Sequence, residues 1–390
     1  MQREVIEKVH IVDHIVNTPT EYNQAVRMSR QSVPDGEDPD NWITLKDPKT
    51  GKKLYSKIPQ YKRKTDYEFE MRNKIKSDKP ALPLTIEKIR VVHKSELESE
   101  KFGFGHEAAG EVIEVAQPSS VKIGDRVVVQ PQNACGKCSL CLIGEHIHCQ
   151  NGRNVRQITG SSTGTATFAQ YILKQDNLLS PIPDGISYEH AGMACCGLGP
   201  TFGAMMQMQV HAHDTILITG LGAVGLGGVV NANYLGARII GVESHPYRAN
   251  LAKELGAETV LNPNDENTLK QIMDLTDGSG VDKALDCSGA SQAHRLMIDS
   301  VRRKGQVCFI GEGGEFPLAA SRDMIRKGLV LRGNWHYNLG DYTKLIRVIE
   351  QSADQLDKYI THTFPMSRVQ EAWEVQTTGE CGKVVLDPWT

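Results

Sequence analysis

Four cysteines fall within fifteen residues of the chain, in the order Cys135, Cys138, Cys141 and Cys149. Two unstrained disulfides are difficult to form among thiols so close together, whereas four thiolates suit one tetrahedral Zn²⁺ with no open position. A closed site of this kind is structural, because it stabilises a loop too polar to make its own core. His146 and His148 lie inside the loop and are expected at the surface, since the thiolates already fill the coordination sphere.

A glycine-rich segment matches the pattern G-x-G-x-x-G. It follows a predicted strand over 215–219 and opens an apolar helical run over 226–234. Its first glycine makes a tight turn, the second lets the backbone approach a pyrophosphate, and the third lets helix pack on strand. The helix N-terminus supplies N–H donors and partial positive charge to the phosphates. The predicted contacts are Gly220, Gly222, Ala223, Val224 and Gly225.

The next predicted strand, over 238–242, ends at Glu243. A carboxylate there accepts hydrogen bonds from both ribose hydroxyls and repels a 2′-phosphate, so the pattern favours NAD over NADP. Arg248 follows and could reach the ribose or its neighbourhood, and Ile310 is a further candidate contact. The alternative is a glycine-rich turn in a parallel sheet that binds no ligand.

The elements that position these residues change character along the chain. From 86 to 173, short β-rich runs alternate with Gly and Pro turns, as in a small all-β unit. From about 190 to 340, short buried strands alternate with helical segments such as 249–255 and 266–275, which predicts a parallel sheet covered by helices on both faces. The tail predicts a helix over 341–351 and a strand over 383–386. The predicted strands are 86–92, 110–115, 126–129, 167–172, 215–219, 238–242, 259–261, 283–286, 306–310 and 329–331.

Composition excludes several classes of protein. The 390 residues carry a net charge of −3, with 39% hydrophobic and 23% charged residues, which fits a soluble globular chain rather than a disordered one. The small net charge gives no overall electrostatic attraction to nucleic acid or to a membrane surface, and no apolar run is long enough to cross a bilayer. The N-terminus lacks the pattern of a signal peptide, so a cytoplasmic location is expected.

A basic stretch over 46–64 is interpreted as solvated surface, with a binding site for single-stranded nucleic acid as the alternative. Residues 3–16 and 21–30 are interpreted as a strand and a helix.

Two further segments complete a recognisable order: Gly105-His106-Glu107-Ala108-Ala109-Gly110-Glu111-Val112, and Cys196-Gly-Leu-Gly-Pro-Thr-Phe-Gly. Together with the cysteine loop and the glycine-rich turn, they resemble the zinc-dependent medium-chain alcohol dehydrogenase family over residues 86–390. The segments 333–337 and 360–365 are more similar to the polyol and secondary-alcohol branch. The resemblance implies an α/β fold, with a doubly wound Rossmann sheet over 196–335. A β-rich GroES-like catalytic domain would take 1–195 and 336–390. It also implies a homodimer or homotetramer.

By this resemblance, His106 and Cys196 bind a catalytic zinc, and Glu107 is a carboxylate beside it that can exchange with water or substrate. A bound zinc lowers the pKa of a substrate hydroxyl, after which hydride passes to the nicotinamide of NAD. The implied cofactors are therefore NAD and two zinc ions per chain, one catalytic and one structural. Cys195 competes with its neighbour for the ligand role, but it is interpreted as a small buried hydrophobe.

The first catalytic-zinc ligand of that family is a cysteine, and this chain has none before Cys135. His93 occupies the nearest matching place, with Ser95 where a proton-relay hydroxyl would lie, and imidazole can replace thiolate on zinc. A second alignment places an earlier strand over 83–89, and the ligand segment is then missing. His10, Asp13 and His14 are further candidates if the N-terminus folds over the site. The extra residues before 86 could form a lid, an oligomer contact or a rebuilt substrate pocket.

The favoured function is zinc-dependent hydride transfer between NAD and an alcohol, a secondary alcohol or polyol by the resemblance, with the matching carbonyl compound reduced in the reverse direction. A reductase of the same superfamily that keeps only the structural zinc is the first alternative, and a non-catalytic NAD-binding protein is the second. Trp335, His336 and Tyr337 are candidates to line the substrate pocket. The residues alone do not identify the substrate.

Overall fold

The computed structural model describes residues 7–13, 42–46, 53–57, 104–116, 118–155, 159 and 164–389. The chain divides into two units, one made of residues 1–15 and 91–390 and the other of residues 16–90. In the smaller unit, β2 (Trp42–Lys46) pairs antiparallel with β3 (Lys53–Lys57). The predicted helix over 21–30 and strand over 86–92 lie outside the described residues, as does most of the basic stretch.

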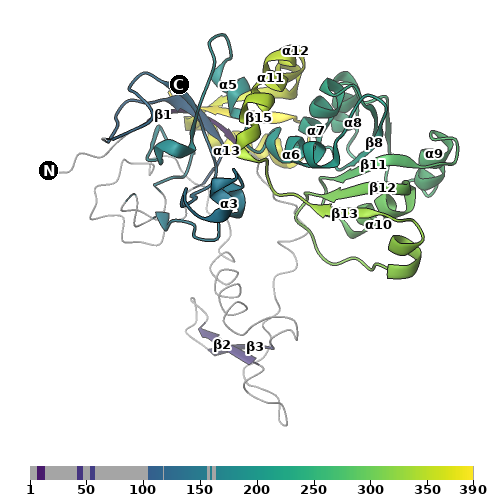
Figure 1. The fold of residues 1–390 in the computed structure, drawn as a ribbon. Coiled ribbons are helices and arrows are strands. Elements are labelled where there is room, and N and C mark those ends of the chain that lie inside the picture. The colour runs from purple at the N-terminus through teal and green to yellow at the C-terminus, as the bar shows by residue number, and fades with distance from the viewer. Residues whose placement is uncertain are drawn as a thin grey trace. The chain divides into compact units, whose positions relative to one another are not determined.

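Six parallel strands form one sheet of the larger unit, in the order β10-β9-β8-β11-β12-β13 (Figure 1). Every neighbouring pair is parallel, and the strand order reverses at the centre, as in a doubly wound sheet. Their bounds are β8 (Thr215–Thr219), β9 (Arg238–Val242), β10 (Thr259–Leu261), β11 (Val281–Asp286), β12 (Val301–Phe309) and β13 (Val330–Gly333).

Helices cover both faces of this sheet. Successive side chains of a strand point to opposite faces, and in β8 Ile216 and Ile218 belong to one core cluster while Leu217 belongs to another. The first cluster includes residues of α7 and α8, and the second includes residues of α9 and α10. Their bounds are α7 (Ala223–Tyr234), α8 (Pro246–Glu254), α9 (Thr268–Asp274) and α10 (Ser291–Ser300).

A second, mainly antiparallel sheet has the order β14-β15-β1-β4-β5-β7, with β6 also paired to β1. Strands from both ends of the chain meet in it, because β1 lies between β15 and β4. Only β14 and β15 are parallel. The bounds are β1 (Glu7–Asp13), β4 (Ala108–Glu111), β5 (Arg126–Val129), β6 (Tyr171–Ile172), β7 (Leu179–Pro181), β14 (Ile360–Pro365) and β15 (Lys383–Asp387).

The remaining helices and turns lie between the strands of the two sheets along the chain. The helices are α3 (Ser139–Leu142), α5 (Tyr188–Gly192), α6 (Gly199–Met208), α11 (Tyr342–Gln351), α12 (Ala353–Tyr359) and α13 (Val369–Thr378). Single turns are η4 (His146–His148), η5 (Asp176–Leu178), η6 (Ala320–Ile325), η7 (Leu339–Asp341) and η8 (Met366–Arg368). Among the residues that the structure describes, no helix combines the length and the apolar character that a membrane span needs.

Two predicted strands of the β-rich region differ from the structure. The strand expected over 110–115 starts two residues earlier and ends at Glu111. Only Tyr171–Ile172 of the strand expected over 167–172 joins a sheet. The backbone N–H groups of Thr167 and Phe168 instead donate to the carbonyls of Gly105 and Phe104. A loop contact therefore replaces ladder pairing there, which local β-propensity cannot reveal.

Candidate active site and metal centres

His106 and Cys196 meet although ninety residues separate them. The imidazole Nε2 lies 3.1 Å from the thiol Sγ. His106 immediately precedes Glu107 and β4, and Cys196 lies on the turn that leads into α6. Imidazole nitrogen and thiolate sulfur are the donors that Zn²⁺ prefers, so the pair fits two ligands of a zinc ion.

Tight backbone packing places the turn that carries Cys196. A Cβ on Gly227 of α7 would lie 1.9 Å from the carbonyl oxygen of Gly197, so only glycine permits this approach. The side-chain amide of Asn231, also on α7, donates to the carbonyl of Leu198 and to Thr201 Oγ1. The helix that follows the glycine-rich turn thus holds the segment that carries Cys196.

Cys195 faces the protein interior. It is fully buried, and its thiol lies 3.4 Å from the carbonyl oxygen of Val129, to which it donates. Burial raises the pKa of this thiol to about 12, which keeps it protonated. These features agree with a small buried hydrophobe, whereas Cys196 is the cysteine beside His106.

Glu107 forms an ion pair with Lys383 of β15. The Lys383 Nζ lies 2.5 Å from Glu107 Oε2, and both side chains are completely buried. The other carboxylate oxygen, Oε1, is buried without a hydrogen-bond partner. Lys383 was not found from the sequence, because a lysine at the start of a strand carries no signal of burial.

Of the candidates for the first zinc ligand, His93 and His14 lie outside the described residues, as does the predicted proton-relay residue Ser95. For His10 and Asp13 the structure describes only the backbone of β1. His106 and Cys196 both have further interactions beyond the contact between them. Within the described ranges, the only group of three or more close metal-binding side chains is the set of four cysteines.

The glycine-rich turn has the geometry of a pyrophosphate cradle. Gly220 has a φ of +78°, and a Cβ on Gly225 would lie 2.0 Å from the Gly220 carbonyl oxygen. Both positions therefore require glycine. Glu243 supports the turn, since its Oε2 accepts from the Leu221 N–H and its Oε1 from the His245 N–H, each at 2.8 Å.

The other candidate cofactor contacts surround this turn. A Cβ on Gly222 would lie 3.9 Å from an Arg248 guanidinium nitrogen, and the buried Nε of that arginine has no partner. Ala223 is buried and Val224 half-buried at the start of α7. Ile310 follows β12, and its N–H donates to the carbonyl of Asp286. Asp286 was missed, although the end of a parallel strand beside the turn is where ligands bind.

The four cysteine sulfurs all lie within 4.8 Å of one another. Backbone N–H groups, chiefly that of Cys141, lower the pKa of Cys138 to about 6. Burial, followed by the neighbouring sulfurs, raises the pKa of Cys141 to about 12. Without a cation, the cluster therefore resists full ionisation, because each thiolate formed opposes the next. A bound Zn²⁺ would remove that opposition, so the donor set fits the ion.

The two histidines of the cysteine loop are not in this group. His148 is exposed, and its ring lies 6.3 Å from that of Trp335. His146 is half-buried, and its Nε2 lies 3.1 Å from the Cys141 carbonyl oxygen. A carbonyl accepts only, so this nitrogen carries the hydrogen.

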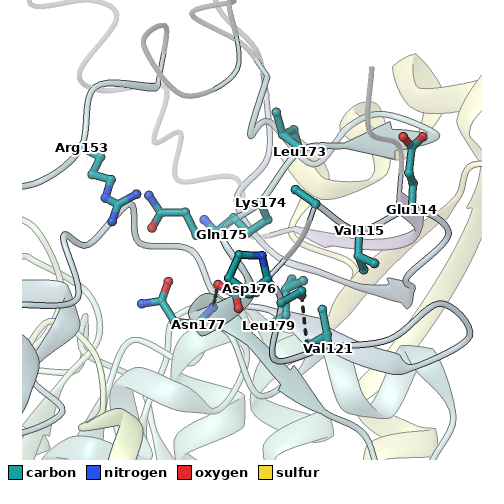
Figure 2. A pocket seen from close by; sticks show the side chains of 13 residues that line it. Glu114, Val115, Val121, Arg153, Leu173, Lys174, Gln175, Asp176, Asn177 and Leu179 are labelled. Atoms are coloured by element: carbon teal, nitrogen blue, oxygen red, sulfur yellow. Dashed lines mark hydrogen bonds between the residues drawn. The ribbon is translucent and has the colours of Figure 1, made fainter. Parts of the chain in front are cut away.

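A cavity of about 270 Å³ lies beside the cysteine loop rather than at His106 and Cys196 (Figure 2). In Figure 2, Arg153 and Gln175 extend toward each other on one side of it, and Asp176 and Asn177 lie nearby. The buried Lys174 side chain donates to the Gln132 carbonyl at 2.6 Å. None of its lining residues belongs to the candidate catalytic pair or to the glycine-rich turn.

The three residues expected to line the substrate pocket differ in solvent exposure and in hydrogen bonding. Trp335 is 58% exposed, whereas His336 and Tyr337 are buried. The Tyr337 hydroxyl lies within hydrogen-bond distance of the Gln130 amide. Both ring nitrogens of His336 are buried without a partner, and burial lowers its pKa to about 3, with the nearby His106 adding to the effect.

Comparison with known proteins identifies the family. A model described as "Alcohol dehydrogenase GroES-like domain" matches residues 84–184, and one described as "Zinc-binding dehydrogenase" matches residues 223–351. L-threonine 3-dehydrogenase of Pyrococcus furiosus is 35% identical, over 72% of this chain and 80% of that protein. D-arabitol-phosphate dehydrogenase of Enterococcus avium is 29% identical, over 73% and 80%.

A solved structure of an alcohol dehydrogenase has a similar fold. An alcohol dehydrogenase from Thermotoga maritima is 26% identical, with a TM-score of 0.65 over 76% of this chain and 88% of that one. The predicted fold class, a doubly wound parallel sheet with a β-rich GroES-like part, is confirmed. The chain belongs to the zinc-binding alcohol dehydrogenases with a GroES-like domain.

Proposed function

We propose that this chain is an NAD-dependent zinc alcohol dehydrogenase whose catalytic zinc is held by His106 and Cys196. The observation that carries the proposal is the 3.1 Å approach of the His106 imidazole to the Cys196 thiol. The two groups come from distant segments, and the cysteine segment packs directly on the cofactor helix. That packing supports a metal site beside the proposed dinucleotide site.

Each residue has a separate task in this proposal. A zinc ion at His106 and Cys196 would act as a Lewis acid toward the substrate oxygen and favour its deprotonation. Glu107, which is paired with Lys383, would provide the carboxylate that directly follows His106 in the chain. His93 would be the third ligand, and Ser95 would relay the hydroxyl proton toward water. The glycine-rich turn and Glu243 would hold NAD, and Arg248 and Ile310 would flank it.

The substrate that we propose is a secondary alcohol or a polyol. Two of the relatives are named for L-threonine 3-dehydrogenation and D-arabitol-phosphate dehydrogenation, and a secondary hydroxyl occurs in both of these substrates. The partnerless, uncharged His336 is the candidate to hydrogen-bond a further polar group of such a substrate. Tyr337 is instead bound to Gln130 and acts in packing.

The proposal also covers a structural zinc, the domain boundaries and the oligomeric form. Cys135, Cys138, Cys141 and Cys149 would hold a structural zinc, so the chain would bind two zinc ions. The catalytic domain would comprise residues 1–195 and 336–390, and the NAD domain 196–335. A cytoplasmic homodimer or homotetramer is the form expected from the family resemblance.

Metal analysis and turnover assays test this function. We expect two zinc ions per wild-type chain, one in His93→Ala and in Cys196→Ala, and NAD reduction with a panel of secondary alcohols and polyols that includes L-threonine and sorbitol. If neither substitution removes a zinc ion, the catalytic assignment is wrong.

A reductase without catalytic zinc is the second candidate. It is favoured by the engagement of Glu107 with Lys383, which occupies one oxygen of the carboxylate that follows His106. This candidate predicts one zinc ion per chain, lost on substitution of Cys138 and retained in Cys196→Ala. A non-catalytic NAD-binding protein would bind NADH but turn over no alcohol or carbonyl compound.

A further inference from the structure

Asp286 joins the ends of the two central strands of the parallel sheet. It is the last residue of β11, is fully buried, and pairs in register with Thr219 at the end of β8. Its Oδ1 accepts from Thr219 Oγ1 at 3.1 Å and from the backbone N–H and hydroxyl of Ser288. Its Oδ2 accepts from the Gly289 N–H at 3.1 Å. One carboxylate thus links the strand before the glycine-rich turn to the turn after β11.

These turns lie in direct backbone contact. A Cβ on Gly220 would lie 2.6 Å from Ser288 Cβ, and one on Gly311 would lie 2.3 Å from the Gly289 nitrogen and 2.8 Å from Asp286 Oδ2. The turns after β8, β11 and β12 therefore interlock around Asp286. In doubly wound sheets, ligands bind at the carboxyl ends of the strands, so a shift of Asp286 would move the surface that meets the cofactor.

His294 of α10 provides the last hydrogen bond to this carboxylate. Its side chain is 6% exposed, and its Nε2 lies 3.1 Å from Asp286 Oδ2. Because a carboxylate only accepts, this nitrogen carries the hydrogen. The ring also packs edge-to-face against Phe309 and Phe316, with centroid distances of 5.1 Å and 5.0 Å. The buried Nδ1 has no partner, so the histidine is oriented by one polar contact, which is to Asp286.

We infer that His294 is a positioning residue for the dinucleotide site. Its N–H holds the Asp286 carboxylate so that the three turns present a preformed surface to NAD. The histidine does not touch the cofactor and acts only through Asp286. This inference rests on the proposed use of NAD, and it assigns a function to a polar contact that neither the glycine-rich motif nor Glu243 explains.

Two substitutions separate the hydrogen bond from packing. His294→Leu keeps an apolar side chain against Phe309 and Phe316 but removes the donor, whereas His294→Gln retains an amide N–H at a similar reach. The dissociation constant for NADH is measured by fluorescence, with zinc content and cofactor-free Tm as checks on folding. We expect His294→Leu to raise this constant about tenfold, the equivalent of one lost charge-assisted hydrogen bond, and His294→Gln to recover most of the affinity.

The controls distinguish the possible failures. His213→Leu, at an exposed histidine of the same unit, should leave NADH affinity unchanged. With NAD saturating, KM for the alcohol should not change in His294→Leu, while KM for NAD rises. Wild-type affinity in folded His294→Leu, or an equal loss in the leucine and glutamine variants, would overturn the positioning role alone. Absence of NADH binding by the wild type would overturn both this role and the proposed function. If His294→Leu does not fold, His294→Asn, whose shorter amide does not reach Asp286, replaces it with the same expectation.

Discussion

The two candidate metal centres differ in how far apart their ligands lie in the chain. The cysteine cluster takes all four sulfurs from one loop of fifteen residues, and its backbone N–H groups bond to the sulfurs of the same loop. His106 and Cys196 lie ninety residues apart and meet only because a turn packs on α7. The first centre is therefore a local structure, whereas the second exists only when both sheets are assembled.

This difference predicts separable consequences of mutation. Loss of a cysteine of this loop should affect mainly stability, because the buried cluster around the described sulfurs adds little more than Ala134 and Leu178, so a bound metal would supply much of the loop's stability. Loss of a ligand at the assembled pair should affect mainly turnover, because the surrounding protein is held by the hydrophobic core and by the Glu107–Lys383 ion pair.

The largest effect is expected at the assembled centre. Cys196→Ala should lower NAD-dependent turnover about 10³-fold or more, since metal Lewis-acid stabilisation is worth several kcal/mol, and should remove one zinc ion while Tm changes little. Steady-state rates and metal content measure this. Cys195→Ala is the matched control, because that thiol is buried away from His106. Equal losses in both variants would show that the two cysteines are not distinguished as the structure indicates.

The next largest effect is expected in the loop. Cys138→Ser should release the other zinc ion and lower Tm by about 10 °C, while the protein that stays folded at low temperature keeps turnover within about tenfold of wild type. Calorimetry and rates at two temperatures test both parts. Lys137→Ala, at an exposed position between Cys135 and Cys138, should change neither Tm nor turnover. If Cys138→Ser lost turnover while its Tm did not change, the cysteine loop would serve catalysis rather than stability, contrary to this prediction.

The buried Glu107–Lys383 ion pair is a second difference between the two candidate metal centres. Among the described residues, the cysteine loop has no buried ion pair of this kind. Lys383→Met leaves the Glu107 carboxylate buried without its cation and should reduce the free energy of unfolding by about 3–5 kcal/mol. Urea denaturation measures this loss. Adding Glu107→Gln should restore much of the stability, because the uncompensated charge is then removed. A single-variant cost below about 1 kcal/mol would mean that the pair does not anchor the strand that follows His106.

The smallest effect is expected at the cofactor turn, which combines a local motif with a carboxylate from the next strand. Glu243→Gln should raise KM for NAD and lower the preference for NAD over NADP about tenfold, because a charge that repels the 2′-phosphate is removed. The ratio of kcat/KM for the two cofactors is the measurement. Glu254→Gln on the exposed face of α8 is the control. An unchanged ratio would mean that Glu243 only accepts hydrogen bonds from the Leu221 and His245 N–H groups and does not select between the cofactors.

The prediction of the parallel sheet is most accurate at its centre, where β8, β9 and β11 are nearly continuous buried runs. The predicted strands over 215–219 and 238–242 have the observed bounds. Strands β7 and β14 were not predicted, and most of the strand over 167–172 was wrong. The short strands of the second sheet depend on partners far along the chain, such as β15 beside β1, and local β-propensity does not encode those partners.

Spacing in the sequence alone determined the cysteine cluster and the glycine-rich turn, because their chemistry requires donors or glycines a few residues apart on one piece of backbone. The tertiary structure alone decided that Lys383 pairs with Glu107 and that Asp286, held by His294, links the turns around Gly220. It also brings Cys196 rather than Cys195 to His106, as the family resemblance implies. Each of these contacts joins residues from different elements. How deeply these side chains are buried, and which way they point, follows from the packing of distant elements, which no local pattern of residues specifies.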